Sequence, residues 1–511
     1  MKKKLIVLAS MALILSTLGC TRKKTTTKHR YTTRGNQSTT KTVRTTTKTK
    51  TNTYEPVENK TIYVSNTGDK NKSGTSQLAP TTLDNALSTM DSGDTIYLIE
   101  GTYEFEESVI ISNSGSEVKR NTIIAEDGVI FDFSQTKEDS TLNNGGLVIN
   151  GSYWQIENIT VINSDYYGFR ITGRGNRVIS CNANSNDYGG FYIKTSLSTF
   201  TNCMALKNSM LGYVAYGFYI DGTGENNTFD SCIANDNLDS GFMIVASKTT
   251  EFNKCLAFNN GLEGDSGSAQ RSGFVFNNKG HIFTNCIAYN NALSGFMVPI
   301  RYGEKGSITI VNCEAINNHY RNYSLISNKA DTITFTNSLS FNNYDKNDDG
   351  EIDAINDYVI GNVTNSIFFY NKSYYYEVKN EKFDSTNTSI EVIDFSEFTN
   401  EYTINMDIPE EMKQYDPEEK AAIDEAAAED EIEPDYSSLE YTIIYYKDGV
   451  LNIYDYLDRS EVFQDELFEK LELENDYFGS FINPEAPEEP IEPEEPTNPD
   501  EQTPVEGNEG E

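Results

Sequence analysis

The sequence predicts an all-β protein whose main part is a solenoid of the parallel β-helix type. The first reason is a small residue that recurs at intervals along the chain. One position recurs as a cysteine at intervals that run from 22 residues (Cys181 to Cys203) to 31 residues (Cys255 to Cys286), and an asparagine follows each cysteine by five residues. The pairs are Cys181 and Asn186, Cys203 and Asn208, Cys232 and Asn237, Cys255 and Asn260, Cys286 and Asn291, and Cys313 and Asn318. The series is extended by Asn158 with Asn163 at its start, and by Ser338 with Asn343 and Ser366 with Asn371 at its end.

Two further observations give each repeat three short strands. An apolar residue stands three positions before the recurring cysteine, as at Val178 and Phe200. After the asparagine comes Gly-Phe-x-apolar, as at residues 190–193. These runs alternate with a period of two and are too short for helices, so they predict strands. A unit of three strands that repeats at this length is typical of a parallel β-helix.

The recurring columns are expected to line the interior of the solenoid. Coils stacked ~4.8 Å apart bring the cysteine, alanine, phenylalanine and isoleucine rows into one continuous core. The asparagine row suits an internal ladder at a turn, in which each amide bonds to the neighbouring coil. We expect the six cysteines to be buried free thiols, because stacked identical positions seldom have disulfide geometry.

Residues 1–20 have the organisation of a bacterial secretion signal. Three lysines precede an apolar run from residue 5 to residue 18, which is too short for a convincing membrane span. The ending Thr17-Leu18-Gly19-Cys20 resembles a lipoprotein cleavage box, so Cys20 is the expected lipidation site. The alternative is an ordinary signal with a chance cysteine. The expected location is therefore the outer face of the cell membrane, through a lipid anchor, or the medium after secretion.

Residues 21–60 form a linker rich in Thr and Lys, and its basic part contrasts with the net charge of -37 for the whole chain. Such a composition cannot bury a core and predicts a disordered tether. A nucleic-acid-binding arm would have the same composition, but export argues against a nucleic-acid partner. We expect a monomer attached to the membrane by its lipid.

The β-helix is expected over residues 61–395, with a short helix near its start. Thr61 begins the first strand, and residues 82–87 place Leu83, Ala86 and Leu87 on one helical face. This helix is expected to cap the open N-terminal end of the solenoid, as terminal units of solenoids must be capped.

The C-terminal part of the chain is acidic and changes in character. Residues 396–482 contain a candidate helix at residues 418–428 and a candidate hairpin that turns at residues 447–449 (Lys-Asp-Gly). Residues 483–511 are rich in Pro and Glu and are expected to be disordered.

Three insertions interrupt the repeat. Extra residues fall between Asn208 and Gly217 and between Asn260 and Gly273, at the same turn of two coils. Loops that leave one edge of a solenoid together can wall a groove. The third insertion, residues 299–306, leaves after a different strand and carries Arg301.

At these coils the sequence resembles polysaccharide lyase family 9, the pectate-lyase-like right-handed β-helix enzymes, over residues 61–380. The matching segments are residues 63–65 (Tyr-Val-Ser), 93–97 (Gly-Asp-Thr-Ile-Tyr), 101–103 (Gly-Thr-Tyr), 152–154 (Ser-Tyr-Trp), 156–158 (Ile-Glu-Asn), 175–176 (Gly-Asn) and 186–187 (Asn-Asp). The resemblance implies a right-handed, single-stranded β-helix. It also implies cleavage of uronate polymers by β-elimination, in which Ca²⁺ neutralises the uronate carboxylate and a lysine removes the proton at C5.

The residues that should carry this chemistry depart from the family pattern. The family's calcium cluster reads Asn-x-Asp-Asp-Gly-x-Asp, and residues 237–243 here read Asn-Leu-Asp-Ser-Gly-Phe-Met, so only Asp239 matches a ligand. Tyr216 stands where an aspartate is expected before Gly217. Val275 stands at the position of the catalytic lysine and cannot abstract a proton.

Other residues at the same turn are weaker candidates. Asp236, Asp239, Glu263 and Asp265 lie in two adjacent copies and offer oxygens to one Ca²⁺, although a solvated acidic loop has the same composition. The candidate bases are Arg271, Lys279 and Arg301, each of which is also an ordinary surface cation. Tyr188, Tyr213 and Tyr216 are candidates for stacking on sugar rings.

A separate calcium motif lies at residues 345–353. Asp345, Asn347, Asp349, Glu351 and Asp353 match the first nine positions of an EF-hand-type loop, with Gly350 at the sharp bend. Asn356 stands where the bidentate glutamate is usual, and flanking helices are not evident. The loop predicts a Ca²⁺ clip on a coil insertion, or else an ordinary Asn/Asp turn.

Two functions remain open at this point. The first is a surface β-helix that engages acidic polysaccharide and cleaves it by Ca²⁺-assisted β-elimination. The second is a non-catalytic glycan-binding or adhesion protein with the same scaffold. Export and the repeat favour both equally, Val275 and Tyr216 favour the second, and the family resemblance favours the first.

Overall fold

The computed structural model describes most of the repeat region and short parts of the C-terminal region. The described residues are 59–136, 145–209, 215–262, 270–277, 279–299, 307–325, 332–336, 338–342, 357–359, 362–364, 367–370, 413–415, 417–429, 434, 436, 439, 441–443, 446–447, 450–451, 477–478 and 481–482. The chain divides into two compact units, Met1–Val57 and Glu58–Glu511, and the described residues all belong to the second. No helix in the described ranges is long and apolar enough to cross a membrane.

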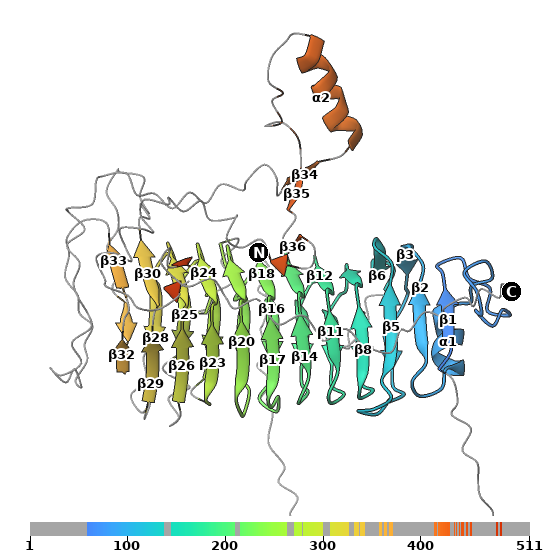
Figure 1. The fold of residues 1–511 in the computed structure, drawn as a ribbon, viewed down its shortest axis with the longest axis horizontal. Coiled ribbons are helices and arrows are strands. Elements are labelled where there is room, and N and C mark those ends of the chain that lie inside the picture. Colours follow the sequence, from blue (N-terminus) through green and yellow to red (C-terminus); the bar gives the residue numbers. More distant parts are fainter. Residues whose placement is uncertain are drawn as a thin grey trace, which may run out of the picture. The chain divides into compact units, whose positions relative to one another are not determined.

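Three parallel sheets run along the coils (Figure 1), which confirms the predicted right-handed parallel β-helix. Sheet A contains β1 (Thr61–Val64), β2 (Thr95–Leu98), β5 (Asn121–Ala125), β8 (Trp154–Glu157), β11 (Arg177–Ile179), β14 (Thr199–Thr201), β17 (Asn227–Asp230), β20 (Thr250–Asn253), β23 (His281–Thr284), β26 (Ser307–Val311), β29 (Thr332–Thr336) and β32 (Asn362–Thr364). Sheet B contains β3 (Gly101–Glu104), β6 (Val129–Asp132), β9 (Thr160–Ile162), β12 (Asn182–Asn184), β15 (Met204–Leu206), β18 (Ile233–Asn235), β21 (Leu256–Phe258), β24 (Ile287–Tyr289), β27 (Glu314–Ile316), β30 (Leu339–Asn342) and β33 (Ile367–Tyr370). Sheet C contains β4 (Val109–Ile111), β7 (Leu147–Ile149), β10 (Tyr167–Ile171), β13 (Gly189–Ile193), β16 (Tyr216–Ile220), β19 (Phe242–Ile244), β22 (Phe274–Phe276), β25 (Ser294–Val298), β28 (Arg321–Leu325) and β31 (Tyr358–Val359).

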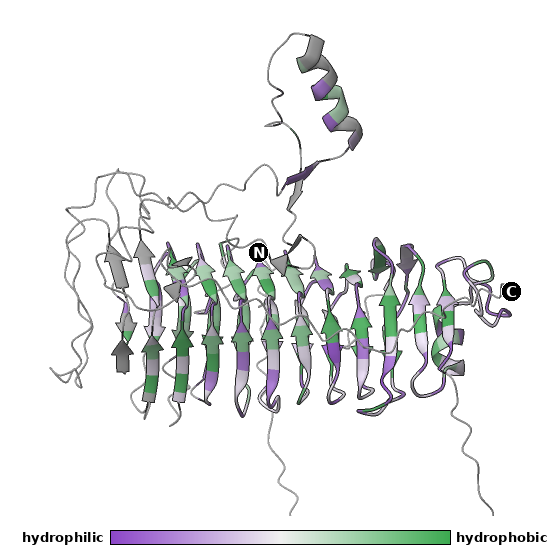
Figure 2. Ribbon diagram, viewed as in Figure 1, coloured by the Kyte–Doolittle hydropathy of each residue, from purple (hydrophilic) through white to green (hydrophobic). Residues whose placement is uncertain are grey.

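The apolar columns of the sequence form the interior, as predicted. In sheet C the rings of Phe169, Phe191 and Phe218 lie directly above one another, with successive centroids 4.7 Å apart. A second stack in sheet A contains Phe200, Phe229, Phe252 and Phe283. Figure 2 shows hydrophobic residues (green) recurring on the strands of successive coils. The register therefore repeats identical side chains along the core, and neighbouring rings bury one another.

The asparagine ladder is also confirmed, and it lies at the turn from sheet B to sheet C. The amide nitrogen of each fully buried ladder residue donates to the amide oxygen of the next at 2.8–3.1 Å, from Asn186 to Asn318. The same nitrogen donates to a carbonyl oxygen of the preceding coil, as Asn260 does to Ala234 at 3.0 Å. Each ladder amide thereby satisfies turn groups on two coils that the interior would otherwise leave without a partner.

The ladder also explains why glycine precedes phenylalanine in the repeat. At the Gly positions from Gly168 to Gly295, an added Cβ would lie 2.7–3.1 Å from the amide nitrogen of a ladder asparagine. A side chain at these positions would push the ladder amide out of its hydrogen bonds. The motif Gly-Phe-x-apolar is therefore a packing requirement of the asparagine row.

The extension of the series to Asn158 and Asn163 was wrong by one residue. The strand register places Ile159 level with Cys181, since Thr160 pairs with Asn182. Ser164 takes the ladder position, and its backbone N–H donates to the amide oxygen of Asn186 at 3.0 Å. Asn158 and Asn163 instead adopt left-handed backbone conformations, with φ of 62° and 57°. Interior and turn positions both accept asparagine here, so the five-residue spacing matched the wrong pair. Ser338 does lie level with Cys313, as predicted, while Ser366, Asn343 and Asn371 lie outside the described residues.

The six cysteines are buried, free thiols, as predicted. Each sulfur lies within 3.3–3.6 Å of a backbone carbonyl oxygen, as Cys203 does to Val178 at 3.4 Å. Burial raises the pKa of the Cys181 thiol to about 12. The Cys181 thiol is therefore protonated at neutral pH, and it packs as a small hydrophobe.

A second column of buried polar groups lies at the start of the sheet A strands. Asn176, Ser198 and Asn227 each accept a hydrogen bond from a backbone N–H of the preceding coil. His281 takes this role farther along, where its Nδ1 accepts from the backbone N–H of Thr250 at 3.2 Å. Its Nε2 lies 2.8 Å from the amide oxygen of Asn277, so Nδ1 is the acceptor and Nε2 carries the proton. Burial lowers the pKa of His281 from 6.5 to about 3.

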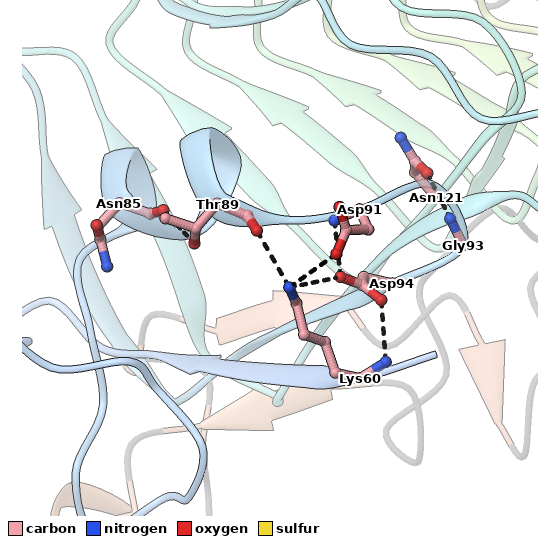
Figure 3. Close-up of polar contacts among 7 residues, drawn as sticks. All are labelled: Lys60, Asn85, Thr89, Asp91, Gly93, Asp94 and Asn121. Carbon is pink, nitrogen blue, oxygen red and sulfur yellow. Dashed lines mark hydrogen bonds and ion pairs between the residues drawn. The ribbon is translucent and has the colours of Figure 1, made fainter. Parts of the chain in front are cut away.

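The N-terminal coil carries the predicted capping helix, α1 (Leu83–Thr89), with Thr82 as its N-cap. Leu83 and Ala86 belong to the buried core cluster. An ion cluster ties the end of α1 to the first strand (Figure 3). The ammonium of Lys60 lies 3.1 Å from the carbonyl oxygen of Thr89, 3.2 Å from Asp91 and 3.3 Å from the buried Asp94. Helix α1 is thus held in place by apolar contacts and by this ion cluster.

The described elements beyond Tyr370 are one helix and three two-stranded pairs. Helix α2 (Pro417–Glu429) covers the stretch where a helix was expected. Strands β36 (Tyr446–Lys447) and β37 (Val450–Leu451) pair as the expected hairpin, with Lys447 opposite Val450. The pairs β34 (Lys413–Tyr415) with β35 (Tyr441–Ile443), and β38 (Tyr477–Phe478) with β39 (Phe481–Ile482), were not predicted. Cys20, residues 1–58, 345–353 and 483–511 lie outside the described residues and remain predictions.

Replacing one ladder residue, Asn260→Ala, should destabilise the solenoid strongly. The substitution removes the donors to Ala234 and Asn291 and the acceptor for Asn237 inside the core. Leaving several buried polar groups unsatisfied costs about 3 kcal/mol or more. Chemical denaturation measures the loss, and Asn182→Ala on the outer face of β12 is the control, expected to change little. Equal stability of the two variants would show that the hydrogen bonds of the ladder do not stabilise the solenoid more than an outward asparagine does.

The buried His281 should make the protein less stable in acid. The imidazole of His281 takes up a proton below pH 6.5 in the unfolded chain, but only below about pH 3 in the folded chain. Protonation of this group therefore does not lower the free energy of unfolding above pH 6.5. The free energy of unfolding should fall by ~1.4 kcal/mol for each unit by which the pH is lowered between these two values. Denaturation at several pH values measures this slope, and His281→Asn should flatten it even if the variant is less stable overall. An unchanged slope in the variant would contradict the assignment of this acid sensitivity to His281.

Candidate functional site

The outer face of sheet C carries a continuous column of side chains that the core does not use. The Phe and Ile of each strand point inward, so the residue between them points outward. The strand register aligns these outward residues from coil to coil as Arg170, Tyr192, Tyr219, Met243, Val275 and Met297. The first three are polar and half-buried, whereas Met243 and Val275 are fully buried. The column therefore has a polar, aromatic part and an apolar part.

The aromatic part is a cluster of six tyrosines, here called the tyrosine cluster. It comprises Tyr166, Tyr167, Tyr188, Tyr192, Tyr216 and Tyr219. Ring centroids of neighbouring members lie 4.9–5.7 Å apart. Tyr166 and Tyr188 lie at the turn from sheet B to sheet C, and the other four lie on strands β10, β13 and β16. The cluster spans three successive coils, so its rings form one surface rather than isolated side chains.

Charged groups surround the tyrosine cluster. The guanidinium of Arg170 lies over the ring of Tyr166, 5.4 Å from its centroid. Among the described residues no carboxylate forms an ion pair with Arg170, and its Nε is buried without a hydrogen-bond partner. Its positive charge is therefore uncompensated by the described side chains, and it lies beside aromatic rings.

Tyr192 is held by an acidic partner on the next coil. Its hydroxyl donates to Asp221 at 2.9 Å, and the ammonium of Lys194 lies 4.0 Å from the same carboxylate. Burial, together with this hydrogen bond to Asp221, raises the pKa of Tyr192 above its ordinary value. The phenol is therefore neutral at neutral pH and donates a hydrogen bond. A phenol held neutral in this way is a poor base and a good binding group.

Two aspartates stack at the turn that leads into the cluster. Asp165 and Asp187 follow the ladder positions of neighbouring coils, Ser164 and Asn186. Partial burial and the charge of Asp165 raise the pKa of the Asp187 carboxyl. Thr136 donates to Asp165 from the preceding coil, 3.2 Å away. This edge of the cluster is acidic, in contrast to the Arg170 side.

The residues singled out from the sequence lie farther along the same turn. Asp239 is fully buried, and the hydroxyl of Ser240 lies 2.9 Å both from its carboxylate and from the carbonyl oxygen of Gln270. Arg271 follows Gln270, so the structure brings the Arg271 segment beside Asp239. Asp236 is half-buried in a left-handed conformation next to the ladder. Glu263, Asp265, Arg301 and Tyr213 lie outside the described residues.

Lys279 and Val275, which were also singled out from the sequence, do not lie beside Asp239 and the Arg271 segment. Lys279 lies beyond the far end of β22, on the side where the chain turns toward sheet A. Val275 lies in the middle of β22, fully buried between Met243 and Met297 of the neighbouring coils. The position of the family's lysine is thus an apolar and inaccessible point on the face of sheet C.

The donor set here does not fit the family's calcium site. Asp239 is buried against Ser240, and Tyr216 stacks on Tyr219 with centroids 5.5 Å apart. Within the described ranges no three His, Cys, Asp or Glu side chains come together so that they could hold a metal ion. Calcium prefers six to eight oxygen ligands, which these side chains do not supply. The loop with Asp345, Asn347, Asp349, Glu351 and Asp353 is untested by these residues and stays a calcium-site prediction.

Sequence reasoning missed Arg170, Tyr192 and Tyr219, which form the centre of the polar face. They occupy the variable position of Gly-Phe-x-apolar, and only the inward residues of that motif were used. The useful signal was the identity of this variable residue in consecutive copies. It reads Arg, Tyr, Tyr, Met, Val and Met, which separates a polar half from an apolar half.

Comparisons with known proteins agree with the architecture. The sequence profile of the Pel9A-like, right-handed β-helix region matches residues 62–332. A pectate lyase L of Thermoclostridium stercorarium is 29% identical over 313 residues, 56% of this chain and 23% of that protein. A pectate lyase L of Paenibacillus polymyxa (strain SC2) is 28% identical over 295 residues, 54% of this chain and 62% of that protein. The chain therefore spans less than two thirds of the length of either relative.

The crystal structure of pectate lyase Pel9A gives the same result in three dimensions. It superimposes with a TM-score of 0.50 and 25% sequence identity, and covers 56% of this chain and 77% of that chain. The matched region of the profile contains nearly all the described coils, including the whole tyrosine cluster. From the profile match, the register of its coils and the structural likeness, the chain belongs to the Pel9A-like right-handed β-helix family.

Proposed function

We propose that the outer face of sheet C, around Arg170 and the tyrosine cluster, binds an acidic polysaccharide at the cell surface. The observation that carries this proposal is the guanidinium of Arg170, which lies over Tyr166 and has no carboxylate partner among the described residues. A uronate carboxylate is the planar anion that a guanidinium binds with two parallel hydrogen bonds. The neighbouring rings offer flat apolar surface to the C–H faces of sugar rings.

The arrangement along the coils suits a polymer. Equivalent positions on successive coils are ~4.8 Å apart, so Arg170, Tyr192 and Tyr219 form a row about 10 Å long. The hydroxyl of Tyr192 is fixed by Asp221 and lies beside Arg170 in the strand register. A chain molecule that lies along this row meets a cation and two aromatic rings in succession. The relatives named pectate lyase support a uronate polymer as the ligand class.

We propose binding without turnover. The family's β-elimination needs a base near the C5 proton, and Val275 provides none. Tyr192, at the centre of the polar face, has a raised pKa and keeps its proton at neutral pH, so it is not available there as a base. The second candidate function is a lyase with a displaced base, which the position of Arg271 beside Asp239 favours. An arginine keeps its proton at neutral pH, so it is also a poor base unless its surroundings change this strongly.

The proposal extends to the location of the protein. Residues 1–20 are the expected signal, and a lipid on Cys20 would hold the β-helix at the outer face of the bacterial membrane. A protein released to the medium would use the same binding face. In both cases the chain acts as a monomer, since the polar face is complete within one set of coils.

Arg170→Gln should weaken binding of polygalacturonate at least tenfold. The substitution removes a charge-assisted pair that is worth about 1.5–3 kcal/mol, and every 1.4 kcal/mol is a factor of ten. Calorimetry or affinity electrophoresis measures the dissociation constant at two salt concentrations, because the lost pair should also reduce the salt dependence.

Arg177→Gln is the matched control for this experiment. Arg177 belongs to the same coil but is exposed on the face of sheet A, so it should bind as the wild type does. Tyr192→Ala should weaken binding in addition, because it removes a ring from the row. Equal weakening by Arg170→Gln and Arg177→Gln would reduce the effect to net charge and contradict the proposed face.

A further inference from the structure

The outward row of sheet C continues toward the N-terminal coils beyond Arg170. The strand register places Val148 of β7 and Ile110 of β4 in the same column as Arg170, one and two coils earlier. Val148 is almost buried, whereas Ile110 is 57% exposed. Successive coils are ~4.8 Å apart, so the Cα atoms of Ile110 and Arg170 are separated by about 10 Å along the row. A polymer that lies on the row therefore meets Ile110 with a different sugar unit from the one at Arg170.

Ile110 differs in its position from the other large apolar side chains that the described part of the chain leaves exposed. Those others are Leu78, Val118, Leu197, Leu262 and Tyr320, and each lies in a turn or loop. Ile110 lies in the middle of a strand, between Val109 and Ile111, which are buried in the core. These two neighbours hold its side chain in the outward direction. An apolar contact that is fixed before binding loses little conformational entropy when a ligand covers it.

The surroundings of Ile110 disfavour a carboxylate. Residues 105–113 and 145–153, which contain β4, β7 and residues on either side of them, include no lysine or arginine. Glu107 is exposed and precedes Ile110 by three residues, about 10 Å along an extended chain and within one Debye length at low salt. The neighbouring Ser108 donates to the carbonyl oxygen of Gly145 at 3.0 Å, which fixes this turn beside the start of β7. A uronate carboxylate at Ile110 would thus meet an apolar group and a negative charge.

Uncharged polar groups follow the strands on this part of the row. Asn150 comes directly after β7 and Thr172 directly after β10, and both are exposed. The hydroxyl of Thr172 donates to the amide oxygen of Asn150 at 2.8 Å, so the amide nitrogen is the group that can donate to a ligand. The equivalent positions on the next two coils are Lys194 and Asp221, which are charged. The row therefore changes from a neutral part at Ile110 to a charged part beyond Arg170.

We infer that the row binds uronate polymers that are partly methyl-esterified, with a free carboxylate at Arg170 and a methyl ester at Ile110. This inference rests on the proposed function and defines its ligand more closely. Methyl esterification removes the negative charge of a uronate and adds a methyl group, which are the two changes that Glu107 and Ile110 favour. The ester carbonyl still accepts a hydrogen bond from an amide such as that of Asn150. An O-acetyl group would also add a methyl group, but it would leave the negative charge in place.

Affinities for three preparations of polygalacturonate test this inference: one unesterified, one partly methyl-esterified and one fully methyl-esterified. Wild-type protein should bind the partly esterified polymer about fourfold more tightly than the unesterified polymer, which is the factor for one methyl group removed from water. It should bind the fully esterified polymer about tenfold more weakly than the unesterified one, because Arg170 then has no anion to pair with.

Ile110→Gln should bind the partly esterified and the unesterified polymers equally, with its affinity for the unesterified polymer unchanged. Leu78→Gln is the matched control, because it makes the same kind of change at an exposed apolar side chain in the loop between β1 and α1. This control should keep the fourfold preference.

The outcomes separate this inference from the proposed function. If wild-type protein has no preference for the partly esterified polymer, or if Ile110→Gln keeps that preference, the inference is overturned. The proposed function then still stands, provided that binding of the unesterified polymer depends on Arg170. Tightest binding of the fully esterified polymer, or binding of none of the three, would overturn both.

A charge substitution gives an independent measurement. Glu107→Gln should bind the unesterified polymer more tightly and reduce the preference for the ester, and both changes should shrink at high salt because the charges are exposed. Glu251→Gln removes the same charge from the exposed outer face of sheet A and is the matched control. It should keep the wild-type preference. Equal effects of the two substitutions would reduce the result to net charge and contradict the position of the ester beside Glu107.

Discussion

The structure depends on one constraint, which is that every coil must satisfy buried polar groups of its neighbours. The turn from sheet B to sheet C directs one asparagine side chain of each coil into the solenoid, where water cannot reach the backbone groups around it. The asparagine ladder from Asn186 to Asn318 meets this need with hydrogen bonds that run from coil to coil. The glycines beside the ladder and the stacked phenylalanines follow from it, because each must keep the same register on every coil.

Because the inward positions are fixed by this register, variation is confined to outward positions and turns. In sheet C the outward column gives Arg170 and two tyrosines on one part and Met243 and Val275 on another. In sheet B the outward columns change from asparagine to Phe258 and Tyr289. The scaffold is that of the Pel9A-like family, while the side chains on its outer faces differ from those that the family's β-elimination requires. Fold and function are thus carried by different sets of residues in the same strands.

The sequence was informative at the inward positions, where the same type of residue recurs once in every coil. The cysteine, asparagine and phenylalanine columns predicted the strands, the ladder and the buried thiols, because each recurs once per coil at an inward position. The prediction failed at Asn158 and Asn163, where asparagine serves a left-handed turn conformation next to the ladder position. Both environments accept asparagine, so spacing alone cannot tell them apart. Tyr188 and Tyr216 of the tyrosine cluster were candidates from the sequence, but Arg170, Tyr192 and Tyr219 were missed for the opposite reason. Arg170, Tyr192 and Asp221 meet only through coil stacking, and the outward residue changes its type from coil to coil, so it does not stand out as the repeated inward residues do.

The central claim is that the face at Arg170 and Tyr192 holds an acidic polysaccharide that the protein does not cleave. Full-length protein mixed with polygalacturonate, first with calcium and then with chelator, gives both quantities in one sample. The bound fraction is measured by sedimentation, and cleavage by the ultraviolet absorbance of the unsaturated uronate product. The account predicts binding with a flat absorbance trace under both conditions. A rise in absorbance that calcium supports and the chelator stops, or the absence of binding, would contradict it.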